Sequence, residues 1–194
     1  TATCHLDLDG DRPMSSILKV SEIQDPTNGN TALAIDSSGN VKTKNIYVAA
    51  GRSGVQTLTD DTFTLVQFNT QVASNGLSWD TSNYKCTFSA ANAGTYAIRV
   101  GIAFFSATNT YQEAIIQPLK NGSEIVQTLC LINGTGGGTT LGAVRHLCGI
   151  SQTTESFASG DEFSVNALFE VGSGNPDVHQ RQFGTELLLM RIGD

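Results

Sequence analysis

Short segments rich in β-branched and aromatic residues, each followed by turn-forming residues, dominate the sequence after residue 54. Turns such as Asn121-Gly122 and Ser159-Gly160-Asp161 recur at the spacing of an antiparallel sandwich. No segment of helical length shows an apolar period of three to four residues. We predict strands at residues 56–59, 63–66, 77–80, 85–89, 94–106, 113–120, 123–131, 141–152, 162–170 and 186–192. The predicted fold is all-β, with two antiparallel sheets packed as a sandwich.

The composition supports this fold class and excludes some partners. Charged residues make up only 15% of the chain, and 20 glycines accompany many Thr, Ser and Asn residues, which favours strands and turns. A net charge of -7 repels phosphate backbones, so we expect no nucleic acid partner. No apolar stretch reaches the length of a membrane-spanning helix, so we expect no membrane insertion.

The pattern changes near Gly54. Before it, short extended pieces alternate with turns such as Asp25-Pro26 and Asn28-Gly29-Asn30, and these pieces are too short to bury a core. We therefore expect an extended N-terminal arm over residues 1–54 and a jelly-roll head over residues 55–194. Unpaired strand edges seek partners, so the arm should pair with neighbouring subunits or another protein.

The sequence offers no convincing catalytic or metal site. His5, His146 and His179 are scattered, and no Gly-x-Ser-x-Gly motif presents a nucleophile, so we predict neither an enzyme nor a cofactor. Asp7, Asp9 and Asp11 are weak candidates for a hard cation. Their sequence departs from a calcium-binding EF-hand loop, and a solvated acidic turn is the preferred interpretation.

Four cysteines, at positions 4, 86, 130 and 148, leave the disulfide state open. Cys86 and the others read best as small buried apolar residues, and a bridge between Cys130 and Cys148 is the alternative. Glycosylation at the Asn121 and Asn133 sequons also stays open.

Two loops are candidates for contacting a receptor, because exposed loop tips on a rigid sandwich commonly carry specificity. A strand is expected after the glycine-rich stretch, so we interpret this stretch as a loop between strands and not as a phosphate site. The candidate contact residues are Gly134, Gly136, Gly137, Gly138, Ser173 and Asn175.

From Val66 onward the order of short motifs resembles the globular head shared by complement recognition subunits and the tumour necrosis factors. The matching pieces are Val66-Gln-Phe-Asn, Trp79-Asp, Cys86-Thr-Phe, Ala93-Gly-Thr-Tyr-Ala-Ile, Leu119-Lys-Asn-Gly, Ala158-Ser-Gly-Asp-Glu-Phe, Phe183-Gly and Leu187-Leu. The resemblance implies a jelly roll that forms a homotrimer. It also implies that Tyr96, Phe104, Phe163 and Leu187 lie on the sheet facing the threefold axis or in the core behind it.

Residues 34–46 resemble short repeats in phage tail fibres, head fibres and capsid decoration proteins, and no Gly-X-Y repeat precedes the head. The combination predicts a homotrimeric, non-enzymatic protein on the virion surface, attached to the capsid or another virion protein through its arm, as a decoration protein or head fibre. The alternative is a receptor- or glycan-binding head, either on a phage tail fibre used for host attachment or in a secreted, extracellular complement-like module.

Overall fold

A computed structural model describes the backbone of residues 22–24, 31–35, 41–43, 45–106, 110–132, 139–140 and 146–193. The chain divides into two compact units, Thr1–Lys44 and Asn45–Asp194, and each is described by itself. In the first unit, β1 (Glu22–Gln24), β2 (Thr31–Ile35) and β3 (Val41–Thr43) pair antiparallel in the order β1-β2-β3.

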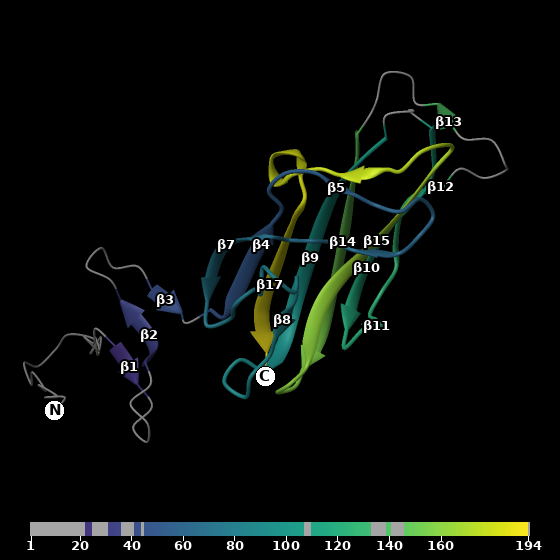
Figure 1. The fold of residues 1–194 in the computed structure, drawn as a ribbon. Helices are drawn as coiled ribbons and strands as arrows, with labels where there is room; N and C mark the ends of the chain where they lie inside the picture. Colours follow the sequence, from purple (N-terminus) through teal and green to yellow (C-terminus); the bar gives the residue numbers. More distant parts are fainter. Residues whose placement is uncertain are drawn as a thin grey trace, which may run out of the picture. The chain divides into compact units, whose positions relative to one another are not determined.

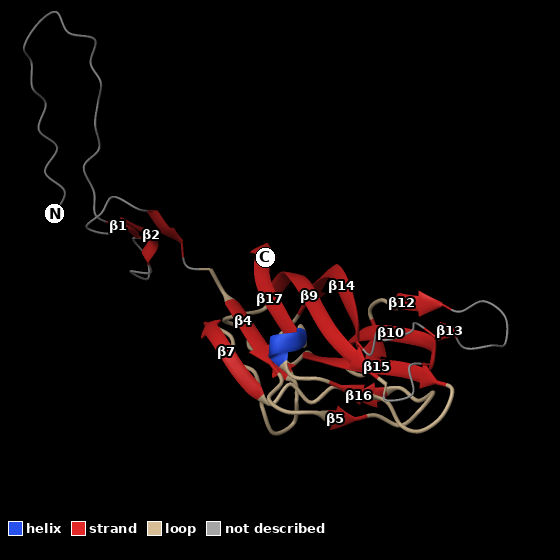
Figure 2. Cartoon of the chain, turned by 90° about the horizontal axis from the view of Figure 1, so that it is seen from above, coloured by secondary structure: helices blue, strands red, loops and turns tan. Residues whose placement is uncertain are grey.

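The second unit, the head, consists of two antiparallel sheets (Figures 1 and 2). In the sheet that we call the β9/β17 sheet, the order is β5-β16-β9-β17-β4-β7, and β14 also pairs with β9. Its strands are β4 (Tyr47–Gly51), β5 (Gln56–Thr57), β7 (Thr70–Asn75), β9 (Gly94–Phe105), β14 (His146–Phe157), β16 (Asp177–Val178) and β17 (Glu186–Gly193).

The other sheet, the β10/β15 sheet, has the order β11-β10-β15-β6. Strands β12 and β13 also pair with β10, and β8 pairs with β15. Its strands are β6 (Thr64–Leu65), β8 (Cys86–Thr87), β10 (Thr110–Lys120), β11 (Ser123–Glu124), β12 (Thr128–Ile132), β13 (Thr139–Thr140) and β15 (Glu162–Val171).

The core lies between these sheets because successive side chains of their long strands point to opposite sides, and each strand places an apolar set on the inner side. Every second residue of β9 from Tyr96 to Phe104 is buried, and so is every second residue of β15 from Phe163 to Val171. Aromatic pairs link the layers: the Phe88 and Phe157 rings stack 4.2 Å apart. Trp79 fills the core and still satisfies its polar atom, because its indole Nε1 donates to the carbonyl of Phe68 at 2.7 Å.

The predicted all-β, antiparallel two-sheet sandwich is confirmed. The helical turn among the described residues is the short 3₁₀ helix η1 (Arg181–Phe183). No helix in the described part of the chain is long and apolar enough to cross a membrane.

The head begins earlier in the chain than the boundary at residue 54 that we predicted. Strand β4 pairs with both β17 and β7, and its Val48 and Ala50 are buried in the core. A five-residue strand between turn residues does not reveal from its own sequence which unit buries it. The compact unit therefore starts at Asn45.

Some strand predictions also differ from the structure. The strand predicted at residues 77–80 is instead a loop that buries Leu77 and Trp79, whereas β7 just before it was missed because all its side chains are exposed. The strand predicted at 123–131 is split into β11 and β12. Of the strand predicted at 141–152, the first residues lie outside the described part, and β14 runs on to Phe157.

Candidate functional site

The exposed surface of the β9/β17 sheet is the candidate site. Strands β4, β17, β9 and β14 lie side by side, and their register places Leu188 and Gln152 on either side of Arg99. Alternation turns these side chains away from the core, together with Ala49, Ala97, Ile150 and Met190. We call these seven residues the apolar face.

Large aliphatic side chains stand open on this face. Ile150 is 51% exposed and Met190 is 39% exposed, while Leu189, which points to the opposite side of β17, is buried. A strand that is apolar on both sides is typical of a sheet covered on both sides. The core covers one side only.

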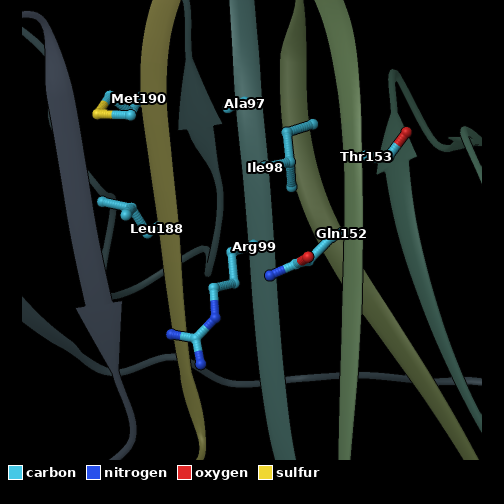
Figure 3. Close-up of a pocket in the computed structure, with 7 residues that line it drawn as sticks. All are labelled: Ala97, Ile98, Arg99, Gln152, Thr153, Leu188 and Met190. Atoms are coloured by element: carbon cyan, nitrogen blue, oxygen red, sulfur yellow. The ribbon is translucent and has the colours of Figure 1, made fainter.

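The apolar face is hollowed rather than flat. A hollow of about 270 Å³ is lined by Ala97, Ile98, Arg99, Gln152, Thr153, Leu188 and Met190. Figure 3 shows Leu188 and Met190 extending from β17 on one side of it and Gln152 reaching from β14 on the other. A second hollow of about 150 Å³ lies against Ala49, Glu186 and Leu187 and shares Arg99 and Leu188 with the first. The two hollows together form a groove with aliphatic walls.

One ion-pair network marks the edge of this groove. Arg99 Nη1 lies 3.4 Å from Glu186 Oε1, and Glu186 Oε2 lies 3.5 Å from Arg181 Nε. These side chains are about half exposed, so each pair contributes only about 0–1 kcal/mol. Further along β9, the outward side of the sheet is no longer exposed. Ala103, four residues after Arg99, is buried, and its N–H donates to Thr185 Oγ1 at 3.0 Å.

This arrangement is suited to binding through shape and apolar contact. Among the described residues no group of three His, Cys, Asp or Glu could hold a metal ion. The titratable residues that line the groove, Arg99 and Glu186, are paired with each other.

The four residues expected at or behind the threefold interface all lie in the core. Tyr96, Phe104 and Phe163 are fully buried, and Leu187 is 2% exposed. The Tyr96 hydroxyl donates to the carbonyl of Asn92. In β9 and β17 it is the residues one position further on, such as Ala97 and Leu188, that face outward.

The remaining predicted positions divide into described and undescribed residues. Ser173 and Asn175 lie in the exposed turn between β15 and β16. The following residues lie outside the described side chains, so their assignments remain predictions: Cys4, Asp7, Asp9, Asp11, Asn133, Gly134, Gly136, Gly137 and Gly138.

Cys86, Cys130 and Cys148 are free thiols, so the alternative of a Cys130–Cys148 bridge is wrong. Cys130 packs against the backbone of Gly149 and the core, whereas Cys148 is exposed. Burial raises the pKa of Cys86 to about 12 and that of Cys130 to about 11, which keeps both thiols protonated. Asn121 sits in a turn with φ 51°; its amide donates to Asp161 and accepts from the Glu162 N–H.

Sequence reasoning missed Arg99, Ile150, Leu188 and Met190. A signal was present in the unbroken run Leu187-Leu188-Leu189-Met190, because a strand with a solvated side should alternate with polar residues.

Comparison with known proteins places this architecture among antiparallel jelly rolls. No family model matches the sequence, and no curated protein matches it either. Eiger TNF from S. frugiperda matches with a TM-score of 0.52 at 10% identity, over 77% of this chain and 92% of that chain. Murine APRIL at pH 8.0 matches with a TM-score of 0.52 at 13% identity, over 77% of this chain and 100% of that chain. The head therefore has a tumour necrosis factor-like jelly-roll fold, as the resemblance predicted.

Proposed function

We propose that this chain is the subunit of a homotrimeric, non-enzymatic binding head, assembled through the apolar face. The observation that carries the proposal is the exposure of Ile150 and Met190 beside an aliphatic groove. Exposed apolar patches of this kind mark interaction sites in soluble proteins. The simplest way to cover the apolar face is with two further copies of this chain, because a closed symmetric oligomer buries the same surface on every subunit.

The composition of the face supports this occupant. Its walls are Ala49, Ala97, Leu188 and Met190, and each Å² of apolar surface removed from water contributes about 25 cal/mol. Arg99 and Glu186 already neutralise each other, so a second copy can approach without leaving one of these two charges unpaired.

Light scattering on the purified full chain tests this assembly. Wild type should have the mass of a trimer, and Ile150→Asp should shift it to a monomer because the new carboxylate would be buried without a partner. Val55→Asp is the matched control: Val55 is also 51% exposed but lies before β5, away from the apolar face. A wild-type monomer, or an Ile150→Asp trimer, would contradict the proposal.

We further propose that the head sits on a virion surface, fastened by the N-terminal unit to the capsid or another virion protein. The support is the resemblance of residues 34–46 to fibre and decoration repeats, together with the separate strands β1–β3. Deleting residues 1–44 should leave a trimer that no longer associates with particles. Normal incorporation of the truncated head would contradict attachment through this unit.

The alternative is a head that binds a receptor or glycan, on a tail fibre or in a secreted module. The exposed turn that carries Ser173 and Asn175 supports it, since such tips commonly carry specificity. A glycan and host-cell binding screen with the full chain, repeated with Ser173→Ala and Asn175→Ala, tests this function. Binding that the two substitutions abolish would favour it, and a clean negative would remove it.

A further inference from the structure

The hairpin that joins β10 to β11 is a tight Asn-Gly turn. Lys120 and Ser123 pair with each other in the ladder, which leaves Asn121 and Gly122 as the central residues of the turn. Both have positive φ, 51° and 76°, as a type I′ hairpin turn requires. Both are exposed, and a Cβ added at Gly122 would meet no atom within 4 Å. Water therefore reaches this turn.

Asn121 binds the start of β15 through both polar atoms of its side chain and through its backbone. Its Nδ2 donates to Asp161 Oδ1 at 2.8 Å, and its Oδ1 accepts from the Glu162 N–H at 2.8 Å. Its backbone N–H donates to the Glu162 carbonyl at 2.9 Å. We call these hydrogen bonds the Asn121 latch. They hold the turn against β15 where the β10–β15 ladder ends, at the pair Lys120 and Phe163.

The acceptor of the latch, Asp161, is a fixed and ionised carboxylate. Its second oxygen, Oδ2, accepts from the Ala158 N–H at 2.8 Å and lies 3.3 Å from Lys120 Nζ. The hydrogen bond from Asn121, and then the one from Ala158, lower the pKa of Asp161. Position 121 therefore faces a negative charge, and its side chain has to donate.

An asparagine followed by glycine can lose its side-chain amide without an enzyme. The backbone nitrogen of the glycine attacks the asparagine Cγ, a C–N bond closes a succinimide ring, and Nδ2 leaves as ammonia. Water then opens the ring to aspartate or to isoaspartate, according to the carbonyl that it attacks. Glycine favours the first step because it has no Cβ to obstruct the approach.

The Asn121 latch opposes this reaction. Ring closure requires Asn121 Cγ to rotate onto the Gly122 nitrogen, but the latch holds Oδ1 and Nδ2 against the start of β15. We propose that Asn121 is a deamidation site controlled by the latch. The closed latch blocks the reaction, and the product of the reaction prevents the latch from closing again.

Each product breaks the latch in its own way. Aspartate at position 121 cannot donate to Asp161, and it places a second carboxylate beside the first, which is unfavourable. Isoaspartate adds a methylene to the backbone of a two-residue turn, so the pairing of Lys120 with Ser123 is lost. Deamidation therefore frees the end of β10 from β15 irreversibly.

The rate of deamidation in the full chain tests the control by the latch. Wild type is incubated in mildly alkaline buffer with and without denaturant, and mass spectrometry of its peptides follows the replacement of NH₂ by OH. Asn121 should react about tenfold more slowly in the folded head, because two side-chain hydrogen bonds must open first. In denaturant Asn75, which also precedes a glycine, should react as fast as Asn121 and serves as the reference.

A pair of variants locates the control at the latch. Asp161→Ala removes the acceptor of Asn121 Nδ2 and should bring the rate in the folded head close to the rate in denaturant. Glu155→Ala is the matched control, because it removes another carboxylate, 3.1 Å from the same Lys120 Nζ, and leaves the latch intact. It should leave the rate at Asn121 unchanged. Circular dichroism checks that both variants fold.

The effect of the product is tested by a variant that reproduces it. Asn121→Asp should lower the Tm of the head, because two carboxylates then face each other. Asn121→Asp combined with Asp161→Asn should recover part of this loss, because an amide again faces a carboxylate.

The proposal fails on any of four results. Equal rates at Asn121 with and without denaturant would show that the latch does not protect it, and this comparison needs no variant. A rate in folded Asp161→Ala equal to that of wild type would exclude Asp161 as the controlling contact. A Tm of Asn121→Asp equal to that of wild type would show that the latch tolerates the product. A glycan on Asn121 Nδ2 would show that the side chain has a different modification.

Discussion

Single buried polar atoms hold the end of the β9/β17 sheet together. Thr185, just before β17, is fully buried, and its hydroxyl accepts the N–H of Ala103 near the end of β9. A buried N–H without an acceptor costs free energy, so this one hydroxyl stabilises the approach of the two segments.

Thr185→Val should lower the free energy of unfolding by about 1–3 kcal/mol, because the same volume remains and the Ala103 N–H loses its acceptor. Thr185→Ser keeps the hydroxyl and should cost less. Denaturant unfolding of both variants checks the order, and equal losses would show that the methyl group matters more than the hydrogen bond.

Glu170 gives the head a pH dependence of defined sign. Its folded-state pKa is raised above the unfolded value, so the folded head binds the proton more tightly. Its contribution is fully present below the ordinary Glu pKa of about 4.3 and is lost as pH rises through the raised folded-state pKa. In denaturant unfolding against pH, Glu170→Gln should remove this loss; a wild-type curve that runs parallel to that of Glu170→Gln would contradict it.

At the level of elements, long strands rich in apolar residues were predictable, and strands that are very short or wholly exposed were not. The prediction found β9, β10, β15 and β17 nearly to their ends, since each is long and rich in apolar residues. Strand β7 carries no buried side chain and β16 has only two residues, so both lack a pattern of their own. Their pairing is set by neighbours distant in sequence, which local patterns do not show.

The candidate site was predictable only as far as the sheet. Tyr96 and Leu187 belong to two of its strands, but side chains alternate with a period of two, so a shift of one residue exchanges the core for the surface. Which side of Leu187-Leu188-Leu189-Met190 meets the core depends on the register with β9 and β4, and this register emerges only from the fold.

The contact of β12 with β14 can be tested at a glycine. A Cβ on Gly149 would overlap the Cys130 sulfur and come within 3.0 Å of Ile116 Cδ1. Gly149→Ala should therefore destabilise the head by about 1–3 kcal/mol. In the double variant Gly149→Ala/Cys130→Ala, the loss of stability should be smaller than the sum of the losses in the two single variants, because the smaller side chain at position 130 leaves room for the new methyl group. Gly193→Ala, where the nearest atom is 3.8 Å away, is the control; strict additivity would contradict the contact.

For the whole molecule, the position of the unit boundary makes a sharp prediction about truncation. Residues 45–194 contain the entire described core, so a chain without residues 1–44 should keep its β-rich circular dichroism spectrum and its Tm. A chain without residues 1–54 also loses β4, including buried Val48 and Ala50, and should melt far lower or fail to fold. Equal Tm values for the two truncations would contradict the assignment of β4 to the head.

The proposed trimer requires that identical copies of the chain cover the apolar face. Sedimentation equilibrium of the wild-type chain is its most direct test, because it needs no substitution and no partner. We predict a single species with three times the chain mass of 20.5 kDa. A stable species of one chain mass over the same range of concentrations would contradict it.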